Sequence, residues 1–189
     1  FTYDYEAIIP GLLKRWYEER QEMQRKMREC GDNEIEREYW DKRQLVKKIN
    51  LNSLYGAILN PGCRFFDMRI GQSVTLTGRC ITQHMASKVN EVVTGEYDHK
   101  GESIVYGDTD SVYFSAYTTL QKEIKEGVIP WTKDSVVALY DKIADEVNGS
   151  FKSFMTKAFH TPSTRGEVIA AGRELVASKG LFITKKRYA

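Results

Sequence analysis

The stretch SIVYGDTDSVYFS, residues 103–115, decides how the middle of this chain folds. An apolar, β-forming run stands at each end, and a Gly-Asp pair, which is common in tight turns, lies between them, so the stretch predicts an antiparallel hairpin. Asp108 and Asp110 then stand at its tip. In an extended stretch, side chains two apart leave on the same side, so the two carboxylates could converge while Thr109 faces away.

Two carboxylates at a hairpin tip are suited to a hard divalent cation. Mg²⁺ accepts one or two carboxylates together with phosphate oxygens and waters, and Asp108 and Asp110 could supply the carboxylates. A bare Asp-x-Asp is also a common polar turn. The flanking Tyr106, Gly107 and Ser111 favour the metal site over the plain turn.

Three motifs resemble those of the family B DNA polymerases. YGDTDS, residues 106–111, resembles motif C, the palm hairpin that holds the catalytic metal ions. Lys48 with NSLYG at 52–56 fits the K-x-x-x-N-S-x-Y-G pattern of motif B in the fingers. KKRY at 185–188 resembles the palm motif that grips the primer–template duplex. The motifs follow the family's order, and the KVNE sequence at 88–91 leans toward the polymerases of T4-like bacteriophages.

Composition excludes several classes of protein. The chain has 189 residues with 41% hydrophobic and 12% aromatic content, which predicts a folded globular protein. A net charge of +2 requires any DNA-binding surface to come from local clustering. Three cysteines without paired spacing argue against a disulfide scaffold or zinc site. No apolar run approaches the roughly 20 residues of a membrane span, so we expect a soluble, intracellular protein without a membrane partner, in the host cytoplasm if a phage encodes it.

The order of the predicted elements favours an α+β fold. Helical periodicity predicts four helices, and two β-like runs close the chain. We expect the helices over 9–28, 34–58, 72–93 and 133–159, and the β-like runs over 167–177 and 181–188. The first two helices should form an antiparallel hairpin. The resemblance implies that residues 1–61 are the fingers, and that residues 62–189 are an incomplete palm with an antiparallel sheet backed by helices.

Candidate nucleotide-binding residues lie on the first two helices. On a helix that advances 100° per residue, Lys48, Asn52 and Tyr55 fall within about 60° of one another and share one stripe. A cation and an amide can bind triphosphate oxygens, and a phenol ring can face a base pair. The complete NSLYG block favours this site over a merely solvated helix face. Arg20 stands where the resembling fingers carry a triphosphate-binding arginine, and one turn later this chain has a glutamine, with Arg25 beside it, where the family commonly has a basic residue.

The closing run predicts a DNA-binding strand. Within a strand, Lys185 and Arg187 should share one face, with Lys186 and Tyr188 on the other. Such residues bind backbone phosphates without reading sequence. Lysines on a strand can also protect an exposed edge from aggregation, but the two other motifs favour DNA contact.

The resemblance implies template-directed nucleotidyl transfer. A primer 3′-hydroxyl would attack the α-phosphorus of a deoxynucleoside triphosphate (dNTP), and two Mg²⁺ ions would stabilise the attacking and departing oxygens. Asp110 would be the more direct metal ligand and catalytic residue, and Asp108 the supporting one. Closure of the helical hairpin would bring Arg20, Lys48 and Asn52 onto the triphosphate.

Other parts of such a polymerase have no counterpart in this sequence. No stretch fits motif A, D-x-x-S-L-Y-P-S, which carries another metal-binding aspartate. We expect that strand, the exonuclease and the thumb to lie outside residues 1–189, so that the isolated chain is inactive. The expected partners are primer–template DNA, dNTP and the remainder of the polymerase, with a sliding clamp as a further candidate.

Two alternatives stay open. A reverse-transcriptase-like polymerase also uses a carboxylate hairpin, although its aspartates are typically adjacent, whereas Thr109 separates the two here. The other alternative is a non-catalytic nucleic-acid-binding module that has kept the basic strand.

Overall fold

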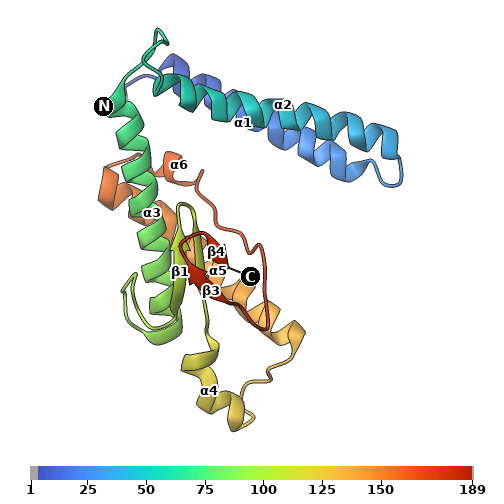
Figure 1. The fold of residues 1–189 in the computed structure, drawn as a ribbon, viewed down its shortest axis with the longest axis vertical. Helices are drawn as coiled ribbons and strands as arrows, with labels where there is room; N and C mark the ends of the chain where they lie inside the picture. The colour runs from blue at the N-terminus through green and yellow to red at the C-terminus, as the bar shows by residue number, and fades with distance from the viewer. Residues whose placement is uncertain (1–3, 189) are drawn as a thin grey trace. The chain divides into compact units, whose positions relative to one another are not determined.

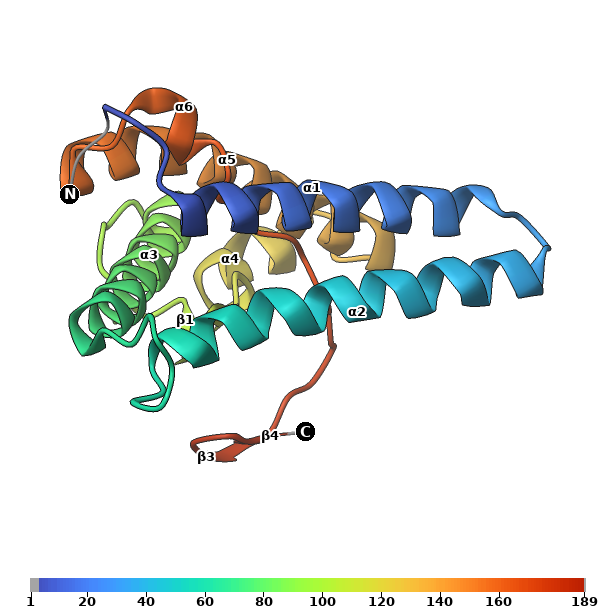
Figure 2. The same cartoon turned by 90° about the horizontal axis from the view of Figure 1, so that it is seen from above.

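Two long antiparallel helices open the chain in the computed structural model, which describes residues 4–188. α1 (Ile8–Glu29) and α2 (Glu34–Ile58) run side by side (Figure 1, Figure 2). The polar turn between them contains Gly31 with φ of 56°, and the Asn33 side chain accepts a hydrogen bond from the Glu36 backbone N–H at the start of α2. The predicted helical hairpin is therefore confirmed.

Polar and aromatic contacts join the two helices. Lys47 of α2 pairs with Glu19 of α1, and the Lys26 ammonium lies 4.6 Å from the centre of the Trp40 ring. Of the residues described in α1 and α2, only Ile58 is buried. The hairpin therefore depends on half-buried contacts along its length rather than on a closed apolar core.

The elements that follow are short strands between longer helices. They are α3 (Met68–Thr94), β1 (Ile104–Asp108), β2 (Ser111–Phe114), α4 (Tyr117–Lys125), α5 (Lys133–Phe159), α6 (Ser163–Gly166), β3 (Phe182–Thr184) and β4 (Arg187–Tyr188). The helices expected at 72–93 and 133–159 are thus confirmed, while α4 and α6 are additions. None of the helices that the structure describes combines the length and apolar composition of a membrane span.

A hydrophobic core lies between α3, α5 and the β1–β2 hairpin. Val89 of α3 packs with Ile143, Val147 and Phe151 of α5. Apolar side chains of β1 and β2 pack against this group, which fixes the hairpin on the two helices. The Thr132 side chain caps the start of α5 in a reciprocal capping box.

The predicted palm sheet is wrong in one respect, because the described strands form two separate two-stranded antiparallel sheets. β1 pairs with β2, and β3 pairs with β4. Each strand pairs with its sequence neighbour across a tight turn. The α+β class is confirmed, and its sheets are small and local.

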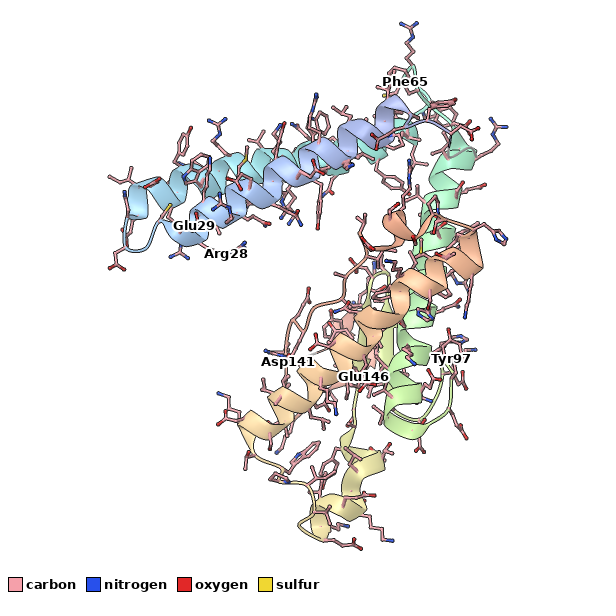
Figure 3. The ribbon with its side chains drawn as sticks, turned by 180° about the vertical axis from the view of Figure 1, so that it is seen from behind. Arg28, Glu29, Phe65, Tyr97, Asp141 and Glu146 are labelled. Carbon is pink, nitrogen blue, oxygen red and sulfur yellow. The ribbon has the colours of Figure 1, made fainter. Side chains whose placement is uncertain are left out.

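The β-like run at 167–177 forms no strand. The Asn148 side chain of α5 donates to the Ala171 carbonyl at 2.9 Å and accepts from the Ala171 N–H at 2.7 Å. Arg173 forms an ion pair with Asp141, which also lies on α5 (Figure 3). Asn148 therefore takes both backbone hydrogen-bonding groups of Ala171, which a neighbouring strand would otherwise bond.

The chain divides into two compact units, one up to Val74 and the other from Thr75. This division lies within α3. The assignment of fingers to residues 1–61 and palm to 62–189 remains a prediction.

Candidate functional site

The acidic pair lies at the tip of the β1–β2 hairpin. Asp108 is the last residue of β1 and is half-buried, whereas Asp110 is exposed in the turn. The register pairs Asp108 with Ser111, so Thr109 and Asp110 form a two-residue turn. Gly107 and Asp108 both lie within β1, and the expectation that the Gly-Asp pair supplies the turn is therefore wrong by two residues.

Thr109 does not face away from the carboxylates, as an extended stretch would require. Its φ is 50°, and its hydroxyl donates to Asp108 Oδ1 at 3.2 Å. The Thr82 hydroxyl of α3 donates to the Thr109 carbonyl oxygen at 2.8 Å. The turn breaks the alternation of side chains, because a residue in the left-handed region reverses the chain direction. α3 thus holds the acidic turn through one hydrogen bond that the sequence pattern did not reveal.

The exposed tip suits a divalent cation only in part. Asp108 and Asp110 offer hard oxygen ligands with access to solvent. Among residues 4–188, no group of three or more His, Cys, Asp or Glu side chains is placed to hold a metal ion. Ligands for a metal at this tip would therefore also have to come from phosphates, water or other protein groups.

The KKRY motif is a second hairpin rather than a single strand. Lys185 and Lys186 form the turn between β3 and β4, and Lys186 has φ of 64°. Arg187 and Tyr188 make up β4. The predicted alternation, with Lys185 and Arg187 on one face, is wrong because the turn falls within the motif. All four side chains are exposed, so the basic groups remain available to a polyanion.

Four aromatic side chains bring the two hairpins together; we call them the aromatic cluster. Tyr106, Tyr113, Phe182 and Tyr188 have ring centroids 5.1 to 5.9 Å apart. The Lys186 backbone N–H donates to the Tyr106 hydroxyl at 2.9 Å, and the Tyr113 hydroxyl donates to that of Tyr188 at 2.9 Å. The hydrogen bond with Tyr188 raises the pKa of Tyr113. The acidic and basic hairpins are thus neighbours.

Sequence reasoning named Tyr106 and Tyr188 as parts of motifs, but it did not single out Tyr113 or Phe182 and did not predict that the four rings meet. Tyr106 and Tyr113 flank the acidic turn, and Phe182 precedes the basic one. The only sequence indication was the aromatic content of the β-forming runs, which is equally typical of ordinary strands.

The candidate nucleotide ligands lie on the helical hairpin. Lys48 and Asn52 are exposed on α2, and Tyr55 is half-buried, with its hydroxyl 3.5 Å from the Gly71 carbonyl oxygen. Arg20 of α1 donates from Nε to Gln44 Oε1 of α2 at 3.1 Å. These residues belong to the unit up to Val74, whereas the acidic and basic hairpins belong to the unit from Thr75.

The Arg25 guanidinium forms ion pairs with glutamates of its own helix. It bonds Glu22 at 2.6 Å and Glu29 at 2.7 Å, and both pairs raise the pKa of Arg25. Glu29 is close to the turn that ends α1 (Figure 3). Arg20 is therefore the better candidate for an anion ligand.

Comparison with known proteins places this chain in a family. Residues 3–157, most of the chain, match the family model described as DNA polymerase family B. The chain belongs to DNA polymerase family B. No solved structure matches it.

Relatives of this family B chain come from archaea, a bacteriophage and a plant. The DNA polymerase of Pyrococcus glycovorans is 31% identical over 193 residues, which cover 100% of this chain and 24% of the relative. The DNA-directed DNA polymerase of Escherichia phage RB69 is 34% identical over 158 residues, which cover 77% of this chain and 17% of the relative. The DNA polymerase delta catalytic subunit of Oryza sativa subsp. japonica is 30% identical over 185 residues, which cover 97% of this chain and 14% of the relative. The chain spans about a quarter or less of the length of these relatives.

Proposed function

We propose that this chain is the part of a DNA-directed DNA polymerase that supplies metal-binding carboxylates, triphosphate ligands and a DNA contact. The observation that carries the proposal is the contact between the two hairpins. An acidic tip that can hold cations lies next to a basic turn that can hold a polyanion, in a chain of family B. A polymerase needs both a cation site and a DNA-backbone contact at the place where the primer end reacts with a triphosphate.

Asp110 and Asp108 would hold divalent ions at the hairpin tip. Mg²⁺ fits their hard oxygen ligands, and when bound it supplies stabilisation of the charge on the attacking and leaving oxygens of the phosphoryl transfer. Asp110 is the more exposed of the two and acts as the more direct ligand. The hydrogen bonds of Thr109 with Asp108 and Thr82 hold the turn that presents both carboxylates.

The exposed basic turn would bind the DNA backbone. Lys185, Lys186 and Arg187 neutralise phosphates without reading bases, so this contact should weaken as salt rises. Tyr188 connects the basic hairpin to the aromatic cluster and thereby to β2. The DNA contact is thus coupled to the metal-binding tip through packed rings.

The helical hairpin would bind the incoming dNTP. Lys48 and Arg20 bind triphosphate oxygens as cations, Asn52 donates from its amide, and the Tyr55 ring offers a flat surface to the new base pair. Since the chain spans about a quarter or less of its relatives, the remaining segments of the polymerase are partners in this proposal, alongside primer–template DNA and dNTP. A sliding clamp is a further partner to be tested.

The test is primer extension by the complete polymerase with Asp110→Ala. Loss of a direct metal ligand should reduce the rate by roughly 10³-fold, equivalent to about 4 kcal/mol of transition-state stabilisation. Binding of primer–template DNA without dNTP should change little. The matched control is Asp145→Ala on an exposed part of α5, which should keep full activity.

Two outcomes would contradict the proposal. Full activity of the Asp110→Ala variant would refute the metal role, and a parent polymerase that binds DNA without extending primers would support a non-catalytic module. Mn²⁺ binding followed by electron paramagnetic resonance gives an independent readout, because Asp110→Ala should weaken it and Asp145→Ala should not.

A further inference from the structure

A chain of two hydrogen bonds leads from α2 to the Arg20 guanidinium. Gln44 Nε2 donates to Asp41 Oδ1 at 2.9 Å, and Gln44 Oε1 accepts from Arg20 Nε at 3.1 Å. A carboxylate only accepts hydrogen bonds, so Asp41 requires the NH₂ group of Gln44 to face it. The amide oxygen must then face Arg20. Asp41 therefore sets the orientation in which Gln44 holds the arginine.

Gln44 stands on the same stripe of α2 as the candidate triphosphate ligands. At 100° per residue, Asp41, Gln44, Lys48 and Asn52 fall within about 80° of one another around the helix axis. Gln44 precedes Lys48 by one turn, so the two side chains are neighbours on the helix surface. Its bond with Arg20 ties a cation of α1 to the stripe that carries Lys48 and Asn52.

The contact leaves the phosphate-binding part of Arg20 available. Within the described part of the chain, the contact found for its guanidinium uses Nε alone. Nη1 and Nη2 therefore keep the paired N–H groups that match phosphate oxygens. The acceptor is also neutral, so this contact does not offset the positive charge of the arginine. Arg25 shows the opposite arrangement, because Glu22 and Glu29 occupy its guanidinium and offset its charge.

We propose that Gln44, oriented by Asp41, is a positioning residue that aims Arg20 at the triphosphate of the incoming nucleotide. This inference rests on the proposed function, since it assumes that Arg20 binds the triphosphate. A free arginine side chain loses rotamer entropy when it binds a ligand, and a side chain that is already held loses less. Gln44 therefore raises affinity for dNTP without touching it.

The test is steady-state primer extension by the complete polymerase, with KM for dNTP and kcat measured separately. Gln44→Met keeps the size of the side chain and removes both hydrogen bonds. We expect KM to rise about 5- to 10-fold with kcat nearly unchanged, because the lost contact supports ground-state and transition-state binding alike. Gln44→Glu keeps an acceptor for Nε but adds a carboxylate that competes with the triphosphate, so its KM should rise further than that of Gln44→Met.

The matched control is Lys47→Met, which removes another cross-helix contact. Lys47 pairs with Glu19 and lies 5.8 Å over the Trp16 ring, outside the Gln44 stripe. Its loss should leave KM for dNTP unchanged. An equal rise in KM for Lys47→Met would mean that a loosened hairpin explains the effect, and the proposal would be overturned. An unchanged KM for Gln44→Met would overturn it as well.

Arg20→Ala separates this inference from the proposed function. If Arg20 binds the triphosphate, its loss should raise KM at least about 50-fold, and Gln44→Met should add nothing in the Arg20→Ala background. A large effect of Arg20→Ala with additive effects of Gln44→Met would refute the positioning role alone. An unchanged KM in Arg20→Ala would refute the triphosphate role of Arg20, and with it this inference, while the Asp110 test would stand on its own.

Discussion

Thr109 adopts a backbone conformation that its side chain disfavours. Its φ of 50° lies in the left-handed region, which a β-branched residue enters only at a cost. The residue sits between the two carboxylates, and hydrogen bonds with Thr82 and Asp108 hold it there. The strained backbone of Thr109 therefore helps to set the positions of Asp108 and Asp110 on either side of it.

Replacing Thr109 with glycine should stabilise the fold and reduce function. Glycine has no Cβ penalty at positive φ, so we expect the free energy of unfolding to rise by up to about 1 kcal/mol. The same change removes the hydroxyl that bonds Asp108, so primer extension by the complete polymerase should fall several-fold. Urea denaturation and extension assays measure the two effects.

Thr118→Gly is the matched control for this change. Thr118 is an exposed residue of α4, where glycine lowers helix stability. A gain in stability at Thr118 equal to that at Thr109 would show that strain in the acidic turn is not the cause.

At the scale of elements, the buried Asn90 side chain connects the end of α3 to the loop that leads into β1. Asn90 is 1% exposed and donates to Thr94 Oγ1 at 3.1 Å and to the Glu96 carbonyl oxygen at 2.8 Å. Its Oδ1 accepts from the Ser103 N–H at 3.2 Å and from the Ser103 hydroxyl at 2.7 Å. All the hydrogen-bonding groups of the amide are used, so this side chain helps to fix how the chain enters the acidic β1–β2 hairpin.

Asn90→Ala should destabilise the chain by about 3 kcal/mol, because it leaves buried polar groups of the loop and of Ser103 without partners. Chemical denaturation followed by circular dichroism measures the loss. Glu102→Ala, at an exposed position in the same loop, should change stability by less than about 0.5 kcal/mol. Equal effects of the two substitutions would contradict the role assigned to Asn90.

The whole molecule combines two units with different kinds of stability. The unit from Thr75 has a buried apolar core built on Val89, Ile143, Val147 and Phe151. In the unit up to Val74, the two long helices bury only Ile58 among their residues. Few buried apolar contacts and many solvent-exposed backbone hydrogen bonds are the physical signs of a region that opens locally.

Hydrogen exchange should therefore distinguish the two units. Backbone amides in the middle of α1 and α2 should exchange at least about 10-fold faster than those of α5 between Ile143 and Phe151, since the helical hairpin lacks a closed core. Mass spectrometry or NMR of the exchanging protein measures this directly. Equal protection in α2 and α5 would show that the half-buried contacts of the hairpin stabilise it as well as the apolar core stabilises the other unit.

The sequence by itself determined the features that depend on near neighbours. The helices at 34–58 and 133–159, and the pairing of the strands around the acidic pair, follow from periodicity and turn residues. The motifs also identified the family. The sequence pattern predicted the positions of the turns less exactly, because Thr109 and Lys186 adopt positive φ within runs that look extended.

Only the tertiary structure decided which distant segments meet. Three contacts join residues that no sequence periodicity relates. They are the hydrogen bond from Arg20 to Gln44, the aromatic cluster between the two short hairpins, and the hydrogen bonds of Asn148 with Ala171. The last of these contacts uses both backbone hydrogen-bonding groups of Ala171, within a run that forms no strand. Such contacts depend on how packed elements are placed against one another, and a backbone group pairs with whichever partner packing brings within reach.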